Sequence, residues 1–203
     1  MRFMTTTLTL ALFVTLISNF SHGQEFSADV VYLELSGSVS TSHPSSKLYV
    51  SKDKFRLETN GFQGNILLVD RADQANYVLQ PKKKVYQQLA SGPSQYFRVE
   101  NPDDACASWQ RATDQKIVCE KVDTEVVNGR ETVKYRNKSA SEAATADVWV
   151  DKALKFVVKW QAADTAAELR NIKEEKQSEA LFTVPSDYKT VTPQKGSKGF
   201  SHR

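Results

Sequence analysis

The sequence predicts a mainly β protein with one or more short helices, an α+β fold built around an antiparallel sheet. Two observations predict the sheet. Apolar and polar residues alternate with a period of two in several short stretches, as in strands with one buried and one exposed face. Turn-forming residues separate these stretches, without the regular strand–helix alternation that would indicate a parallel sheet. A third observation, a capped helix start at Asn101, predicts a helix.

The N-terminus is expected to be a signal peptide covering residues 1–23, which is removed on export. Arg2 precedes the apolar run 8–17, which is too short to cross a bilayer, and the small residues Ser21 and Gly23 suit cleavage before Gln24. No cysteine follows the run as a lipid-attachment site, and no second run is long enough to cross a membrane. We therefore expect a soluble periplasmic or secreted protein with one domain over 24–189 and a flexible basic tail over 190–203.

The first half of the mature chain is expected to form a meander of short strands. Phe55 and Leu57 face one side of their strand and Arg56 faces the other, a clear alternation. Residues 36–46 are rich in Ser, Thr, Gly and Pro and are expected to form a loop. The expected strands are residues 26–35, two strands around Leu48 and Phe55 that flank the turn 51–53, and residues 65–70, 76–80 and 85–89.

The middle of the chain is expected to hold a helix at about residues 102–112. Asn101 can accept a hydrogen bond from the first helical turn, and Pro102 has a backbone angle preset for that turn. Cys106 and Cys119 are the two cysteines of the chain, and in an exported protein they suggest one structural disulfide, which stabilises the fold by roughly 3 kcal/mol. A pair of free thiols is the alternative. A redox role is not expected, because the spacing of the two cysteines does not resemble a Cys-x-x-Cys motif.

The second half is expected to continue as hairpins. Asn128 and Gly129 both tolerate positive φ and predict a tight turn. Residues 162–177 have good helix propensity but a thin apolar stripe, so their second half is assigned to a strand. The other expected strands are residues 115–127, 131–139, 145–150, 154–160 and 181–184, which brings the total to about nine to eleven.

Composition argues against several functional classes. The 27 Lys and Arg residues nearly balance the 24 Asp and Glu residues, which does not favour a nucleic-acid partner. After cleavage only His43 and His202 remain, so neither a nucleophilic triad nor a zinc site is recognisable. We predict no enzyme, no catalytic residue, no metal and no cofactor. A hydrolase with an unrecognised carboxylate pair remains a rival interpretation.

Aromatic residues at strand positions carry the main hypothesis about function. They either pack a core, or they line the concave face of a curved sheet that its own side chains leave partly unfilled, so that an apolar molecule fills it. The sequence alone leaves both interpretations open. The aromatic residues are Tyr32, Tyr49, Phe55, Tyr77, Tyr86, Trp149, Phe156 and Trp160.

The order of several segments resembles the periplasmic lipoprotein carriers of the LolA/LolB-like superfamily, in particular a branch of exported bacterial proteins. The likeness rests on residues 48–50, 55–58, 65–70 and 77–86, then on 148–151 and 181–188, with Cys119 leading into Asn128-Gly129. The resemblance implies an open, strongly curved antiparallel half-barrel whose concave face is covered by helix and binds acyl chains or other lipids.

We therefore expect an exported protein, monomeric, that binds a lipid or other apolar ligand non-covalently, as a carrier or chaperone of the cell envelope. The alternative is an envelope structural or interaction protein with a filled core, no ligand and a protein partner. The expected apolar lining consists of Val30, Tyr32, Leu48, Val50, Phe55, Leu57, Leu79, Trp149 and Phe156.

Overall fold

One open sheet makes up most of the protein. The computed structural model describes residues 25–34, 39–40, 44–60, 64–89, 94–112, 117–139, 145–162 and 165–191. The twelve strands in these residues form a single sheet in the order β12-β6-β5-β4-β3-β2-β1-β11-β10-β9-β8-β7. Because β12 and β7 are its two edges, the sheet is not closed. The expected signal peptide and residues 192–203 lie outside the described residues.

The first half of the chain forms the predicted meander, in which each strand pairs antiparallel with the next. Lys84 adopts a left-handed conformation, φ 51°, in the turn between β5 and β6. The elements are β1 Phe26–Leu33, β2 Ser46–Val50, β3 Lys54–Glu58, β4 Ile66–Asp70, β5 Ala75–Gln80, the 3₁₀ helix η1 Pro81–Lys83, and β6 Val85–Leu89.

The second half contains the helices and the predicted hairpins. Asn128 and Gly129 have φ values of 49° and 80°, so both residues of the turn between β7 and β8 occupy the left-handed region, as predicted. The elements are α1 Ser94–Phe97, η2 Pro102–Asp104, α2 Ala105–Ala112, β7 Ile117–Val127, β8 Arg130–Ser139, β9 Thr145–Asp151, β10 Phe156–Gln161, β11 Ala166–Glu174, η3 Glu179–Phe182 and β12 Lys189–Thr190.

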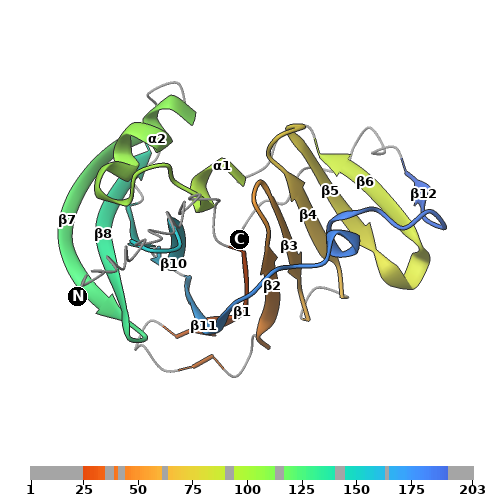
Figure 1. The fold of residues 1–203 in the computed structure, drawn as a ribbon, viewed down its shortest axis with the longest axis horizontal. Coiled ribbons are helices and arrows are strands. Elements are labelled where there is room, and N and C mark those ends of the chain that lie inside the picture. Colours follow the sequence, from red (N-terminus) through yellow and green to blue (C-terminus); the bar gives the residue numbers. More distant parts are fainter. Residues whose placement is uncertain are drawn as a thin grey trace, which may run out of the picture.

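The pairing of β1 with β11 joins the two halves into one sheet. Phe26 lies opposite Val50 on one side and Glu174 on the other, so β1 is fully paired within the sheet. In Figure 1 the sheet bends from β7 and β8 at the left, through β11 and β1 at the bottom, to β6 and β12 at the right. The helices α1 and α2 lie at the top of the view, opposite β1 and β11.

Two strand predictions are corrected. The strand expected in the second half of 162–177 begins earlier, at Ala166, because β1 and β10 pair with it on either side and override its helix propensity. Residues 181–184 form no strand: η3 covers Glu179–Phe182, and Phe182 is buried. The last strand is β12, which pairs parallel with β6 through two residues, too few for an alternation signal. The count of twelve therefore exceeds the predicted nine to eleven.

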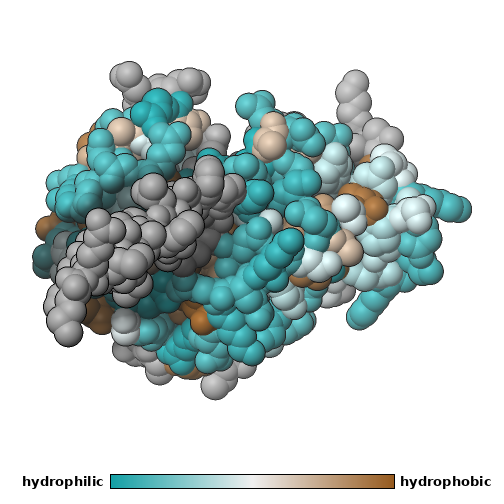
Figure 2. All heavy atoms as spheres, in the orientation of Figure 1, coloured by the Kyte–Doolittle hydropathy of each residue, from teal (hydrophilic) through white to brown (hydrophobic). Residues whose placement is uncertain are grey.

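The buried side chains divide according to the two faces of the sheet. Successive residues of a strand point to opposite faces, so Val30, Leu48 and Phe55 mark one face, which we call the inner face, and the other is the outer face. The largest apolar cluster lies on the inner face and also includes Phe26 and Phe156. Most of the exterior in Figure 2 is hydrophilic, with small separate apolar patches among the described residues.

Candidate functional site

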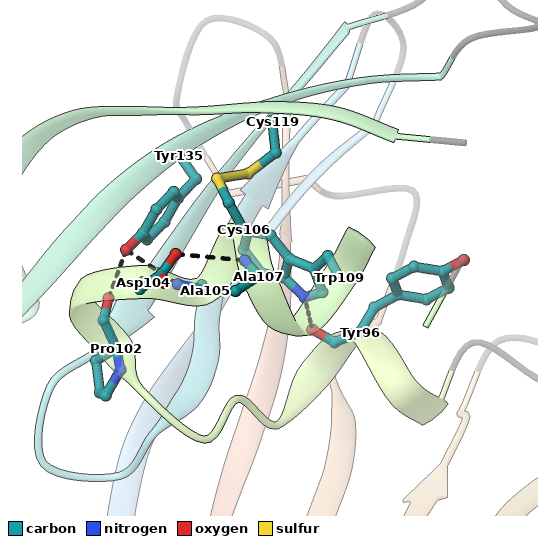
Figure 3. The surroundings of a disulfide bond; sticks show 9 residues. All are labelled: Tyr96, Pro102, Asp104, Ala105, Cys106, Ala107, Trp109, Cys119 and Tyr135. Atoms are coloured by element: carbon teal, nitrogen blue, oxygen red, sulfur yellow. Dashed lines mark hydrogen bonds between the residues drawn. A yellow bond between two sulfur atoms is a disulfide. The ribbon is translucent and has the colours of Figure 1, made fainter. Parts of the chain in front are cut away.

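A disulfide attaches the helices to the sheet. Cys106 of α2 and Cys119 of β7 are bonded, with their Cα atoms 5.5 Å apart, as the sequence predicted. The cap predicted at Asn101 is also present, because the Asp103 N–H donates to Asn101 Oδ1 at 3.0 Å. Figure 3 shows that the disulfide lies beside Trp109, which projects from α2.

Tyr135 of β8 forms hydrogen bonds with the start of α2. Its hydroxyl donates to the Pro102 carbonyl at 2.7 Å and accepts from the Ala105 N–H at 3.2 Å (Figure 3). Burial raises the pKa of Tyr135, so the hydroxyl keeps the proton that it donates. The ring packs edge-on against Trp109, whose indole N–H donates to the Tyr96 carbonyl at 2.9 Å. Together these contacts fix α1 and α2 against the inner face of β8.

An apolar cavity of about 140 Å³ lies on the inner face; we call it cavity A. Its walls come from both halves of the sheet, β1 to β4 on one side and β10 and β11 on the other, together with α1. All ten side chains of the lining are aliphatic or aromatic. They are Val30, Tyr32, Leu48, Phe55, Leu57, Leu67, Phe97, Phe156, Trp160 and Leu169.

Six of the nine side chains that the sequence assigned to a ligand-binding lining meet in cavity A. They are Val30, Tyr32, Leu48, Phe55, Leu57 and Phe156. Val50 belongs to the same buried cluster without being part of the lining. Sequence reasoning missed Leu67, Phe97, Trp160 and Leu169. Of these, Trp160 was noted as an aromatic strand residue, whereas the neighbours of Leu67 are apolar on both sides and hide its orientation.

Leu79 lies on the outer face. It pairs with Ile66, and Ile66 precedes Leu67, which lines cavity A, so Ile66 and Leu79 point the other way. There they pack in a separate cluster, against which Val184 from the C-terminal segment also packs. Burial of β4 and β5 on both faces explains why the alternation in the sequence did not reveal the orientation.

Trp149 also lies on the outer face. The ammonium groups of Lys134 and Lys159, its cross-strand neighbours, lie 4.7 and 4.6 Å from the centre of its ring system. Its indole N–H donates to Glu125 at 2.7 Å. This tryptophan is therefore buried between charged side chains and is not part of the lining of cavity A.

A second cavity of about 160 Å³, cavity B, lies next to cavity A. The two share Phe97 and Trp160 as walls. Phe97, the last residue of α1, stacks on Phe156 with ring centres 6.0 Å apart and meets Phe55 and Trp160 edge-on. The lining of cavity B consists of Tyr96, Phe97, Trp109, Asn137, Val148, Val157 and Trp160.

Arg98 places a positive charge beside cavity A. Its guanidinium group lies 5.8 Å from the centre of the Phe156 ring and donates to the Ser51 carbonyl at 3.5 Å. Burial lowers the pKa of Arg98, the nearby Arg71 lowers it further, and Asp53 opposes the shift. Because the ordinary pKa of arginine is so high, the group stays charged at neutral pH.

The described residues also bear on two other features, a metal site and a membrane-spanning helix. Within them, no group of three or more His, Cys, Asp or Glu side chains could hold a metal ion. No helix in the same part of the chain is long and apolar enough to span a membrane.

Comparison with known proteins identifies a class of fold. No family model and no curated protein matches the chain. Among solved structures, PNGF-II matches with a TM-score of 0.54 and 13% identity over 83% of this chain, which spans only 31% of the PNGF-II chain. An uncharacterised protein of Thermus thermophilus matches with a TM-score of 0.51 and 13% identity, covering 83% of this chain and 90% of that one. These likenesses show a shared fold.

Two further solved structures match the chain. A chain of the MucA/MucB complex of Pseudomonas aeruginosa matches with a TM-score of 0.50 and 14% identity, covering 84% of this chain and 59% of that one. A LolA-superfamily protein of Nitrosomonas europaea also matches, with a TM-score of 0.36 and 9% identity over 79% of this chain and 90% of its own.

Proposed function

We propose that the protein binds an apolar ligand, such as the acyl chain of a lipid, non-covalently in cavity A. The observation that carries this proposal is a cavity lined by aliphatic and aromatic side chains alone, built from both halves of an open sheet. An unfilled apolar pocket is the usual form of a site for a small apolar molecule. The resemblance to lipoprotein carriers supports the same conclusion.

The size of cavity A limits the part of the ligand that it can enclose. At about 140 Å³, it is close to the roughly 150 Å³ apolar cavity that binds benzene in an engineered protein, so it accepts about six carbon atoms. Burial of a methylene group contributes about 0.8 kcal/mol, which gives a gross stabilisation of about 5 kcal/mol. A cavity of this size therefore favours the end of an acyl chain as the part of the ligand that it encloses.

In this proposal α1 and α2 cover the inner face as a lid. Phe97 of α1 belongs to the walls of both cavities, and Trp109 of α2 belongs to the wall of cavity B. The positive charge of Arg98, 5.8 Å from the ring centre of the lining residue Phe156, suits an anionic head group on the ligand. We further propose that residues 1–23 direct export and that the domain over 24–189 acts as a carrier or chaperone in the periplasm.

A chain-length series tests the proposal. Straight-chain alkanoates compete with a fluorescent apolar probe for the purified protein, and dissociation constants are derived from the displacement. Affinity should rise about fourfold per methylene until about six carbons are buried, and then level off. Leu57→Trp, which fills cavity A, should weaken binding at least tenfold. The control is Leu181→Trp at a half-buried leucine of η3 outside both linings, where binding should persist.

Equal binding by the two variants, or no dependence on chain length, would refute a site in cavity A.

A second candidate is then favoured, a protein-interaction role. The edge strand β7 carries Val118, Val122 and Val126, all exposed, along eleven residues that pair on one side with β8. The MucA/MucB match is a complex of two proteins. Cross-linking from a cysteine placed at Val118 would capture a partner if this candidate is correct.

A further inference from the structure

Cavity B contains a buried polar atom without a hydrogen-bond partner. Asn137 of β8 contributes to the lining, and its Oδ1 atom is buried with no partner among the described residues. Roughly nine in ten buried polar groups in proteins are paired, because burying an unpaired acceptor costs about 1–3 kcal/mol. The atom therefore requires an explanation.

The neighbouring described side chains do not supply the missing donor. Asn137 lies between Cys119 of β7 and Ala146 of β9 in the sheet. Cys119 is in the disulfide and has no S–H group, and alanine has no polar side-chain atom. Across cavity B, the indole N–H of Trp109 already donates to the Tyr96 carbonyl. Tyr96 and Trp160 of the same lining also carry donors, but neither is hydrogen-bonded to Oδ1. A donor group that enters cavity B would therefore meet an unpaired acceptor.

We propose that cavity B is a subsite for a hydrogen-bond donor of the ligand, a hydroxyl or amide N–H group, and that Asn137 Oδ1 accepts from it. The inference rests on the proposed function and narrows the ligand to an amphiphile whose donor lies next to an apolar body. The apolar body occupies cavity A. The shared walls, Phe97 and Trp160, set the point at which the ligand passes from one cavity to the other.

A pair of probes of similar size isolates this hydrogen bond. Phenol and toluene differ in a hydroxyl group against a methyl group, and both are close to the size that a cavity of about 160 Å³ accepts. Dissociation constants of both are measured by NMR titration for the wild type and for Asn137→Leu, which keeps the shape of the side chain and removes its polar atoms. The preference for phenol over toluene should fall about tenfold in the variant.

Asn76→Leu is the matched control. Asn76 of β5 also has a buried Oδ1 without a partner among the described residues, but it belongs to the lining of neither cavity. Its replacement should leave the phenol preference unchanged. Asn137→Leu should also fold at least as stably as the wild type, since it removes an unpaired buried acceptor.

Three results would overturn the subsite: an unchanged preference in Asn137→Leu, an equal loss in Asn76→Leu, or no binding of phenol in cavity B. The alkanoate series for cavity A is independent of Asn137. Chain-length-dependent binding that persists in Asn137→Leu would retain the proposed function while the subsite fails. Loss of that dependence in the wild type would remove the proposed function itself.

Discussion

At the scale of single residues, Asp151 connects three parts of the fold. It is 1% exposed. Its Oδ1 accepts from the backbone N–H groups of Ala153 and Leu154 at 2.8 and 2.7 Å, which fixes the turn between β9 and β10. Its Oδ2 pairs with Arg130, which also pairs with Glu174 of β11 at 2.7 Å. One carboxylate thus joins a turn, β8 and, through Arg130, the central strand β11.

Asp151→Ala should therefore destabilise the protein by about 3 kcal/mol, because it leaves two backbone N–H groups without their acceptor and removes one of the two carboxylate partners of Arg130. Asp151→Asn should cost less, since the amide oxygen can still accept from the backbone. Urea unfolding measures both. Asp187→Ala is the control, because its ion pair with Lys84 is exposed, and the midpoint should not change. Similar midpoints for Asp151→Ala and the wild type would contradict the structural role of Asp151.

Asp147 of β9 is expected to make the free energy of unfolding depend on pH. Hydrogen bonds from Arg136 lower its pKa below the ordinary 3.8, burial opposes this shift, and Lys134 adds to the lowering. A carboxyl group with a lowered pKa in the folded state stabilises the fold above its unfolded pKa, and the contribution disappears as the pH falls through the folded pKa.

The free energy of unfolding should thus fall less steeply below about pH 4 in Asp147→Asn than in the wild type. Chemical unfolding at a series of pH values between about 6 and 2 gives both curves. Parallel curves through this range would show that Asp147 has the same pKa in the folded and unfolded states.

At the scale of elements, the disulfide holds α2 against β7 and thereby supports the wall of cavity B. The double variant Cys106→Ser, Cys119→Ser opens a loop with a sequence separation of 13 and should lose roughly 3 kcal/mol of stability. Thermal unfolding with and without a reductant measures this loss. The reductant should have no effect on the double variant, because the chain has no other cysteine. A wild type insensitive to reduction would contradict the prediction.

The same scale shows how far local sequence patterns determine the elements. The β2–β3 hairpin and the turn at Asn128 were predictable because alternation and left-handed turn residues are local signals. The strand β11 was predicted only in part, since its first four residues are buried and show no alternation. Its place between β1 and β10 depends on residues far away in the sequence, as does β12.

The candidate site was predictable to a similar extent. Phe55 and Leu57 were placed correctly because polar residues flank them in the sequence. Leu79 and Trp149 were assigned to the wrong face because the outer faces of their strands are also covered. The C-terminal segment packs on the cluster that contains Leu79, and lysine side chains cover Trp149. Phe97 was missed because it belongs to a four-residue helix without a sequence signature.

At the scale of the whole molecule, the bend of the open sheet produces the two adjacent cavities. The sheet brings β1–β4 and β10–β11 to one apolar cavity, and Phe97 of α1 and Trp160 of β10 are walls of both this cavity and the second. Of the aromatic residues that the sequence left between two roles, Phe55 and Phe156 pack the inner cluster and also line cavity A.

The most direct measurement is the lipid content of the protein itself. The protein is purified without detergent from the cells that produce it, extracted with organic solvent and examined by mass spectrometry. We predict one apolar or amphiphilic ligand in a stoichiometric amount with the wild type, and its loss from an equally well folded Leu57→Trp variant. A folded wild type that carries no such molecule would contradict the central claim that the inner face holds an apolar ligand.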